Sequence, residues 1–190
     1  MRIVASCLVL ALCACGAPPA GRSVLELRGP AWVADPAAGW DAQAEPFVVR
    51  ATGRAPLAGG RHAAELAAES AARQDLRAFA EEAVAGLAAT FRSRNAGLLS
   101  PADLQAVSGD AGARQALGDK ALAGARLQGQ WSDDESFFAW LALDTGDHLL
   151  PAFEEDLSAR LASLARELTA GDRLALRSAM AGLVAPHQGR

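Results

Sequence analysis

Apolar residues between Arg61 and about Ser93 recur every three or four positions, which is the spacing of one helix face. Alanine is the commonest residue of this stretch and no proline interrupts it, so a single long helix is favoured. The face is narrow and mostly small, which suits a helix that lies closely across a sheet. It comprises Ala72, Leu76, Phe79, Ala83, Leu87 and Phe91.

Three further segments have the patterns of strands. Phe47–Ala51 is rich in β-branched and aromatic residues, and Gly53–Gly60 after it is expected to be a connecting loop. Apolar and polar positions alternate in Ala121–Trp131, the period of a half-buried strand. The polar turn Ser132–Ser136 joins that segment to Phe137–Asp144, so the two are predicted to form a hairpin.

The order of the strands follows from their composition. Phe137–Leu143 is apolar on both faces, so it is expected to be a central strand covered on two sides. If the long helix returns the chain across the sheet, the second strand runs parallel to the first. Phe137–Leu143 is then antiparallel to both and lies between them.

Shorter helices are expected on either side of the hairpin. Asn95–Gly97 should end the long helix in a left-handed C-cap, and Ser100 with Pro101 should start another helix, which Ser108–Asp110 splits in two. A helix from about Pro151 to Leu168 carries three acidic residues that are expected in its first turn. A last helix after Gly171 runs to Pro186, and the tail is expected to fray. The helix from Pro151 has an apolar stripe made of Phe153, Leu157, Leu161, Leu164 and Leu168, and its three acidic residues are Glu154, Glu155 and Asp156. The apolar residues of the last helix are Leu176, Met180 and Leu183.

These elements define an α+β fold class: a three-stranded antiparallel sheet packed on one long helix, with additional C-terminal helices. The long helix covers only one face of the central strand. The other face, with Phe138, Trp140 and Ala142, would be an exposed apolar patch unless another element covered it. The C-terminal helices are expected to cover it and so to complete the domain.

The first residues have the pattern of a bacterial lipoprotein signal peptide. Arg2 precedes an apolar run of about ten residues, which is too short to span a membrane. The run ends at Leu12-Cys13-Ala14-Cys15, which looks like a lipobox in which the thiol of Cys15 carries diacylglycerol. An ordinary secretory signal is the alternative, with Ala14 or Ala17 as its small residue. The expected organisation is residues 1–14 as signal peptide, 15–43 as lipidated tether and lead-in, and 44–190 as a single α+β domain with C-terminal helices.

Cysteine usage and charge narrow the classes of function. Cys7 and Cys13 lie in the predicted signal peptide, so the mature chain would keep Cys15 alone and could form no internal disulfide. Two acyl chains on that cysteine would anchor the protein stably. Gly16 rather than aspartate follows it, which by resemblance to proteobacterial lipoproteins favours the outer membrane. The net charge of −4 argues against nucleic-acid binding, which needs a basic patch. Trp32, in the lead-in, is expected to dock against the domain.

The chain resembles the LPP-twenty family of bacterial envelope lipoproteins over roughly residues 30–144. The resemblance implies a small α+β domain with a sheet on a long helix, related to domains of flagellar accessory lipoproteins. It also implies a non-enzymatic role in the envelope and no catalytic residues. The matching residues are Pro30-x-Trp32-Val33, Val48-Val49-Arg50-Ala51-Thr52-Gly53, Ala68-x-x-x-Ala72-Arg73-x-x-Leu76 and Phe138-Ala139-Trp140-Leu141-Ala142-Leu143-Asp144, where the family usually opens with Tyr in place of Phe138.

Candidate chemical groups are weighed against plainer explanations. The three histidines have no paired metal-ligand spacing, and Gly53–Gly60 contains neither phosphate-loop fingerprint. Asp133–Glu135 is either a calcium-binding turn or a solvated hairpin turn, the latter favoured because a fuller spaced ligand set is absent. Acidic pairs are interpreted as exposed helix faces instead of glycosidase carboxylates, and two tryptophans as core residues instead of a ligand platform. These residues are His62, His148 and His187 for the histidines, Glu81, Glu82, Glu154, Glu155 and Asp156 for the acids, and Trp131 and Trp140 for the tryptophans.

Two functional hypotheses follow. The first is a non-enzymatic outer-membrane lipoprotein, lipid-anchored at Cys15 and facing the periplasm, with no cofactor, metal or nucleic-acid partner. It would have a structural or assembly role, with surface or flagellar association as special cases, and would act through contacts with an envelope protein. The second is a periplasmic lipoprotein that binds a small ligand or the cell wall, in a pocket between the sheet and the C-terminal helices.

Overall fold

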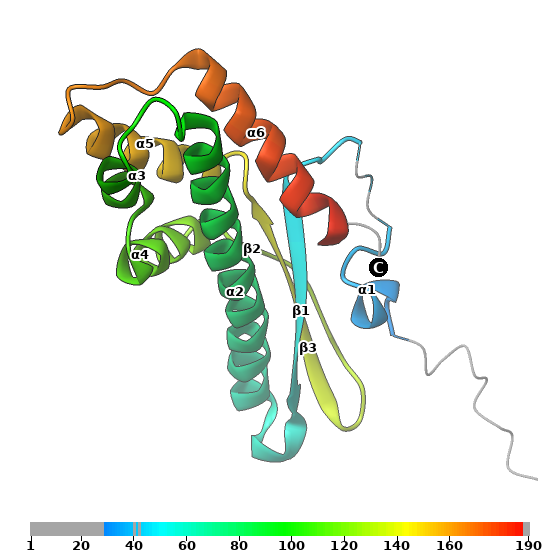
Figure 1. Cartoon of the computed structure of the whole chain (residues 1–190). Coiled ribbons are helices and arrows are strands. Elements are labelled where there is room, and N and C mark those ends of the chain that lie inside the picture. Colours follow the sequence, from blue (N-terminus) through cyan, green and yellow to red (C-terminus); the bar gives the residue numbers. More distant parts are fainter. Residues whose placement is uncertain (1–28, 40, 42, 188–190) are drawn as a thin grey trace, which may run out of the picture.

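The computed structural model describes residues 29–39, 41 and 43–187. At its centre is a three-stranded antiparallel sheet made of β1 (Val48–Pro56), β2 (Arg126–Ser132) and β3 (Ser136–Asp144) (Figure 1). The strand order is β1-β3-β2, so β3 is central and antiparallel to both neighbours. This arrangement confirms the predicted α+β fold class and the predicted place of the hairpin strand.

The long helix α2 (Arg61–Asn95) lies across one face of this sheet, as its small apolar face predicts (Figure 1). Ala68 and Ala72 are completely buried where the helix meets β1. A Cβ atom at Gly53 of β1 would lie only 1.9 Å from the carbonyl oxygen of Ala68. Glycine at this position therefore lets the two backbones approach more closely than any side chain would allow.

β1 is longer than its sequence pattern predicts. It continues through Pro56, and a short 3-10 turn, η1 (Leu57–Gly59), follows, so the prediction of a loop from Gly53 onward is wrong. Ala55 is buried and pairs with Phe137, at the far end of β3. Pairing and packing hold this part of the strand extended, although glycine and proline are poor strand formers.

The end of α2 also differs from the expectation. Ala96, at the C-cap, has right-handed helical backbone angles, so the predicted left-handed cap at Asn95–Gly97 is wrong. The Asn95 side chain is buried, and its amide donates to the Phe91 carbonyl (3.0 Å) and to Asp172 (3.3 Å). The Asn95 side chain thus supplies a donor to a carbonyl of the last turn, and Asp172, 77 positions later, holds that side chain in place.

The split helix between α2 and the hairpin is confirmed. Ser100 accepts a hydrogen bond from the Asp103 amide at the start of α3 (Pro101–Ser108), and Gly109, with a φ of 68°, separates α3 from α4 (Ala111–Leu122). β2 begins only at Arg126, so the strand predicted from Ala121 starts too early. Ala121 and Leu122 are helical instead, because α4 packs against α2, where Gly118 faces Ala80 and Glu81.

A bulge in β2 changes which face its side chains occupy. The register with β3 shifts between Leu127 and Gly129, so Leu127 pairs with Leu141 on the α2 face and Trp131 pairs with Phe138 on the other. Alternation had predicted that Leu127 and Trp131 share a buried face. Instead Leu127 is 44% exposed, and β2 is a largely exposed edge strand.

The first C-terminal helix, α5 (Leu149–Ala162), begins earlier and ends sooner than predicted. Its three acidic residues therefore lie outside the first turn, and Leu164 and Leu168 lie beyond the helix, where Ala165 has a φ of 53°. The second, α6 (Ala170–Val184), starts with a capping box between Thr169 and Asp172. A short turn, η2 (Ala185–His187), follows it, and the His187 ring packs edge-on against Phe79. His187, which lies in the tail that was expected to fray, is thus packed against the domain.

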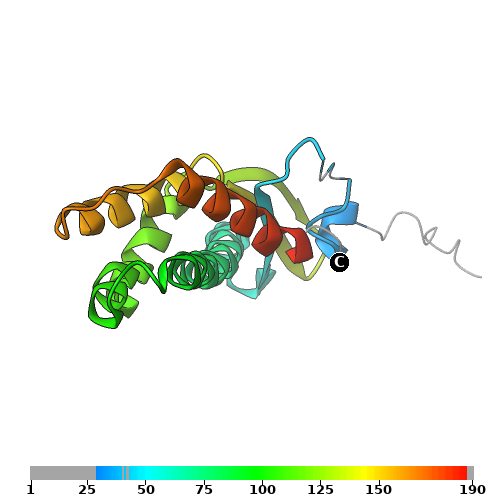
Figure 2. The same ribbon diagram turned by 45° about the horizontal axis from the view of Figure 1, so that its top comes forward.

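The C-terminal helices complete the core, but not on the face that was expected. α6 packs along α2, where Leu183 lies against Gly86, and α5 packs on α3, α4 and α6 (Figures 1 and 2). Buried residues of α2, β3, α5 and α6 form one continuous hydrophobic core. Phe138, Trp140 and Ala142 lie outside this core, so the prediction that α5 and α6 cover them is wrong.

Candidate functional site

The face of the sheet that points away from α2, called here the outer face, carries aromatic and arginine side chains in rows. The strand register places Arg54, Phe138 and Trp131 in one row and Arg50, Ala142 and Arg126 in another. Trp140 lies between these rows, opposite Thr52. The sequence predicted the apolar residues of β3 here, whereas the arginines come from the alternate positions of the two edge strands.

Residues 29–37, called here the docked segment, cover the centre of the outer face (Figure 1). The segment includes the single helical turn α1 (Ala31–Ala34). Trp32 stacks on Trp140 with ring centroids 5.6 Å apart and planes within 4°. The prediction that Trp32 is laid against the domain is confirmed, and this segment does what was expected of the C-terminal helices.

Hydrogen bonds fix the docked segment at both ends of α1. The Thr52 hydroxyl donates to the Trp32 carbonyl (2.9 Å), and the Trp140 indole donates to the Pro36 carbonyl (2.9 Å). The indole of a half-buried tryptophan is thereby satisfied. Trp131 and Trp140 therefore form neither the core pair nor the open ligand platform considered from the sequence: Trp140 lies under the docked segment, and Trp131 packs on Phe138.

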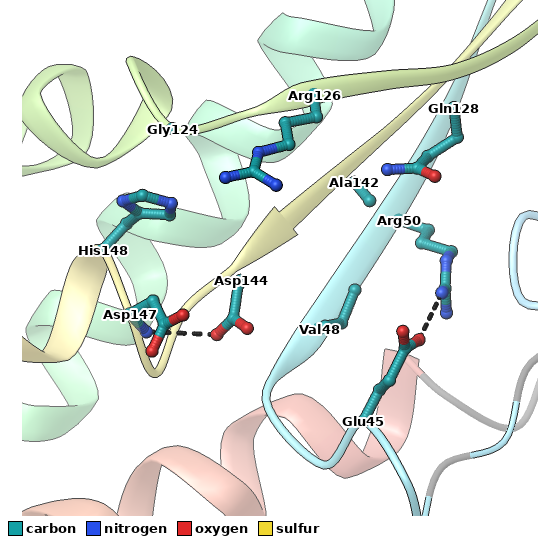
Figure 3. Close-up of a pocket in the computed structure, with 10 residues that line it drawn as sticks. All are labelled: Glu45, Val48, Arg50, Gly124, Arg126, Gln128, Ala142, Asp144, Asp147 and His148. Atoms are coloured by element: carbon teal, nitrogen blue, oxygen red, sulfur yellow. Dashed lines mark hydrogen bonds and ion pairs between the residues drawn. The ribbon is translucent and has the colours of Figure 1, made fainter.

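Beyond the docked segment the outer face ends in a hollow with a volume of about 190 Å³. Figure 3 shows Arg126, Gln128, His148 and Asp144 around it, with Arg50 turned toward Glu45 on the other wall. The side chains come from the segment before β1, both edge strands, the end of β3 and the loop into α5. Its complete lining is Glu45, Val48, Arg50, Gly124, Arg126, Gln128, Ala142, Asp144, Asp147 and His148.

Small residues create the space. Arg50 and Arg126 face the same side of the sheet from strands on either side of β3, so their Cα atoms are about 10 Å apart. The residue between them is Ala142, whose methyl group is too small to fill the space between the two arginines. Gly124 has a related role, because a Cβ atom there would lie 2.4 Å from the His148 ring. His148 can occupy the wall only because residue 124 lacks a side chain.

The charged groups of the hollow fall into two sets. Arg50 forms an ion pair with Glu45, and one carboxylate oxygen of Asp144 accepts from the amides of Gly146 (2.9 Å) and Asp147 (3.1 Å). Among the residues that the structure describes, none forms an ion pair or a side-chain hydrogen bond with Arg126 or with the Asp147 carboxylate. One guanidinium and one carboxylate therefore remain available at opposite walls.

The other residues singled out in the sequence are dispersed. His62 lies near the start of α2, His148 in the hollow and His187 against Phe79. Within the described ranges, no group of three or more His, Cys, Asp or Glu side chains is placed to hold a metal ion. Cys15 lies outside the described residues.

The candidate acidic sites have structural partners. The Asp133 carboxylate accepts from the amides of Glu135 (2.8 Å) and Ser136 (2.6 Å), which closes the hairpin turn. These backbone hydrogen bonds hold the pKa of Asp133 below its usual value, and the bond from the Glu135 amide has the largest effect. The three acidic residues of α5 form ion pairs with three separate basic residues, so they do not converge on one site. The ion pairs are Glu154 with Arg173, Glu155 with Lys120 and Asp156 with Arg160.

No helix of the described ranges has both the length and the hydropathy needed to cross a bilayer. Comparison of the chain with protein-family models, with curated proteins and with solved structures finds no match. The resemblance to the LPP-twenty lipoproteins therefore stays a prediction from the sequence motifs.

Proposed function

We propose that the protein is a non-enzymatic lipoprotein, anchored through Cys15 in the outer membrane and facing the periplasm. It has a structural or assembly role there and acts through contacts with an envelope protein. The sequence Leu12-Cys13-Ala14-Cys15 at the end of the apolar run supports the anchor. The resemblance to the LPP-twenty family supports the envelope role, including its surface or flagellar forms.

The docked segment is the structural observation that carries this proposal. Gly29, fourteen residues after Cys15, lies against the Trp131 ring. A fully extended chain of that length spans at most about 50 Å. A lipid on Cys15 would thus hold the outer face and its docked segment within this distance of the membrane surface. The domain would face its partners from a fixed attachment point.

Lipidation is tested by labelling with palmitate in a bacterium that has the lipoprotein pathway. The wild-type chain should incorporate the label and fractionate with outer membranes, whereas Cys15→Ala should do neither. Cys13→Ala is the matched control, since it removes a neighbouring thiol and keeps the acceptor. Equal labelling of the Cys15→Ala chain would refute the anchor. Proximity labelling from the anchored wild-type chain, with Cys15→Ala as background, would then identify the protein partner.

A second candidate function is binding of a small ligand by the same envelope protein. The hollow at the end of the outer face favours it, because polar side chains from five segments converge there on a concave surface. No residue of α5 or α6 lines the hollow, so it is a different place from the pocket between the sheet and the C-terminal helices that the sequence predicted.

A further inference from the structure

The hollow at the end of the outer face carries charges of both signs that do not neutralise one another. Arg126 forms no ion pair with any described residue, although Asp144 and Asp147 line the same hollow. Asp144 uses one carboxylate oxygen for the β3–α5 turn, and no described side chain or amide donates to the other. A ligand in the hollow therefore meets a guanidinium from one wall and carboxylates from another.

This charge distribution selects against simple ions. An anion on Arg126 would lie near three carboxylates, those of Glu45, Asp144 and Asp147. A cation on the carboxylates would lie near two guanidinium groups. Like charges placed together oppose binding, and a ligand that presents both charges avoids both penalties.

The size of the hollow restricts the ligand further. A volume of about 190 Å³ holds roughly six water molecules at about 30 Å³ each. Pockets for drug-sized ligands are larger, about 300–1,000 Å³. Ala142 and Val48 provide a small apolar surface at the floor, which suits a short side chain. An α-amino acid such as alanine has this size and carries its two charges on adjacent carbon atoms.

We propose that the hollow binds a small zwitterion of the α-amino acid class. The ligand carboxylate binds Arg126, with the Gln128 amide beside it. The ligand ammonium group binds Asp147 and the second carboxylate oxygen of Asp144. A methyl-sized side chain lies on Ala142. The proposal does not depend on lipidation at Cys15, so either can fail without the other.

The test uses the full chain, purified in mild detergent, and isothermal titration calorimetry with L-alanine. L-Lactate and L-alaninamide are the matched probes, because each keeps the shape of alanine and removes one of its charges. L-Alanine should bind with a Kd below about 1 mM, and both analogues should bind at least tenfold more weakly. Absence of alanine binding in this range, or equal binding of either analogue, would overturn the proposal.

Two variants assign the charges to residues. Arg126→Gln should weaken alanine binding at least tenfold and should abolish the preference for alanine over alaninamide, because the ligand carboxylate then loses its guanidinium partner. Asp147→Asn should reduce the preference for alanine over lactate. Arg54→Gln is the control, since Arg54 lies on the same face but outside the hollow. Unchanged preferences in both variants, with melting temperatures equal to that of the wild type, would show that the hollow is not the binding site.

Discussion

Gly53 sets the distance between the long helix and the sheet. It is the one β1 position at which an added methyl group would reach the α2 backbone, 1.9 Å from the Ala68 carbonyl and 2.5 Å from the Ala72 amide. Backbone atoms cannot move aside as a flexible side chain can. The alanines of α2 and the glycine of β1 are therefore parts of one close contact.

Gly53→Ala should destabilise the protein by about 3 kcal/mol or more, at or above the upper end of the usual cost of overpacking. The free energy of unfolding, measured in urea, gives this value directly. Gly97→Ala is the matched control, because a Cβ atom there meets nothing within 4 Å and should change stability little. Equal stability of the two variants would show that α2 can shift away from β1 without cost.

Asp172 joins the end of α2 to the start of α6. It is buried, and it accepts hydrogen bonds from Thr169, Asn95 and Arg94. Burial raises the pKa of this carboxyl, but the hydrogen bonds, led by that from Thr169, outweigh burial and hold the pKa below the usual value of 3.8. The folded state thus favours the ionised form, and its stabilising effect is complete above the unfolded-state pKa.

Asp172→Asn should lower the free energy of unfolding by about 2 kcal/mol at pH 7, because hydrogen bonds to a charged group become neutral ones. The difference from wild type should shrink as the pH falls below about 4, because the carboxyl of the unfolded wild-type chain then takes up a proton, whereas the folded one, with its lower pKa, stays ionised until the pH falls further. Urea unfolding between pH 3 and pH 7 measures the trend. Asp75→Asn on the exposed side of α2 controls for the loss of one charge. A difference that stays constant down to pH 3 would contradict the role of ionisation.

An element could be predicted from the sequence where its own apolar and polar residues indicate how it is buried. An element whose position depends on a contact with a distant part of the chain could not. β3 is apolar from Phe137 to Leu143 because both of its faces are covered, so its central place could be predicted. The alternation of apolar and polar residues in β2 gives no sign of the bulge after Leu127. The bulge places the residues before it on the opposite face of the sheet from the one that regular alternation predicts. The end of α2 likewise depends on a contact that the local sequence does not indicate, the hydrogen bond from Asn95 to Asp172.

The site was less predictable than the fold. Its arginines, Arg50 and Arg126, are 76 residues apart, and only the register of two strands on β3 brings them to one hollow. Ala142 and Gly124 matter there because they are small, which no motif records. His148 was noticed in the sequence, but its neighbours depend on the β3–α5 turn.

Docking of residues 29–37 rests largely on the stacking of Trp32 on Trp140. Trp32→Ala should release the segment and leave the sheet, α2 and the core in place, with a loss of about 2–3 kcal/mol from aromatic burial and stacking. Limited proteolysis should then cut between residues 35 and 47 much faster than in the wild type. Trp32→Phe keeps an aromatic ring on Trp140 and should remain largely protected. If Trp32→Ala is as resistant as wild type, the hydrogen bonds of Thr52 and Trp140 suffice to hold the segment.

The described residues share one core, which extends from the sheet through α2 to both C-terminal helices. The half of α2 that extends beyond the sheet packs on α4 and α6, and Leu87 and Phe91 are buried there. The sheet alone cannot cover these residues. A domain that ended with the sheet would leave a long apolar helix face exposed to water.

Truncation after Asp147 should therefore abolish the native state and not merely shorten it. The chain would lose eight side chains that are each at least 95% buried: Leu149, Leu150, Phe153, Leu157, Leu161, Leu176, Met180 and Val184. Burial of each contributes roughly 1.5–3 kcal/mol, so their sum matches or exceeds the ~5–15 kcal/mol stability of a typical domain. Dye binding to exposed apolar surface and loss of a cooperative melting transition would report the collapse. Met180→Ala in the full chain is the graded control, which should cost about 2–5 kcal/mol and keep the fold. A truncated monomer that melts at the wild-type temperature would show that α5 and α6 are an appendage, and that the sheet and α2 form a domain without them.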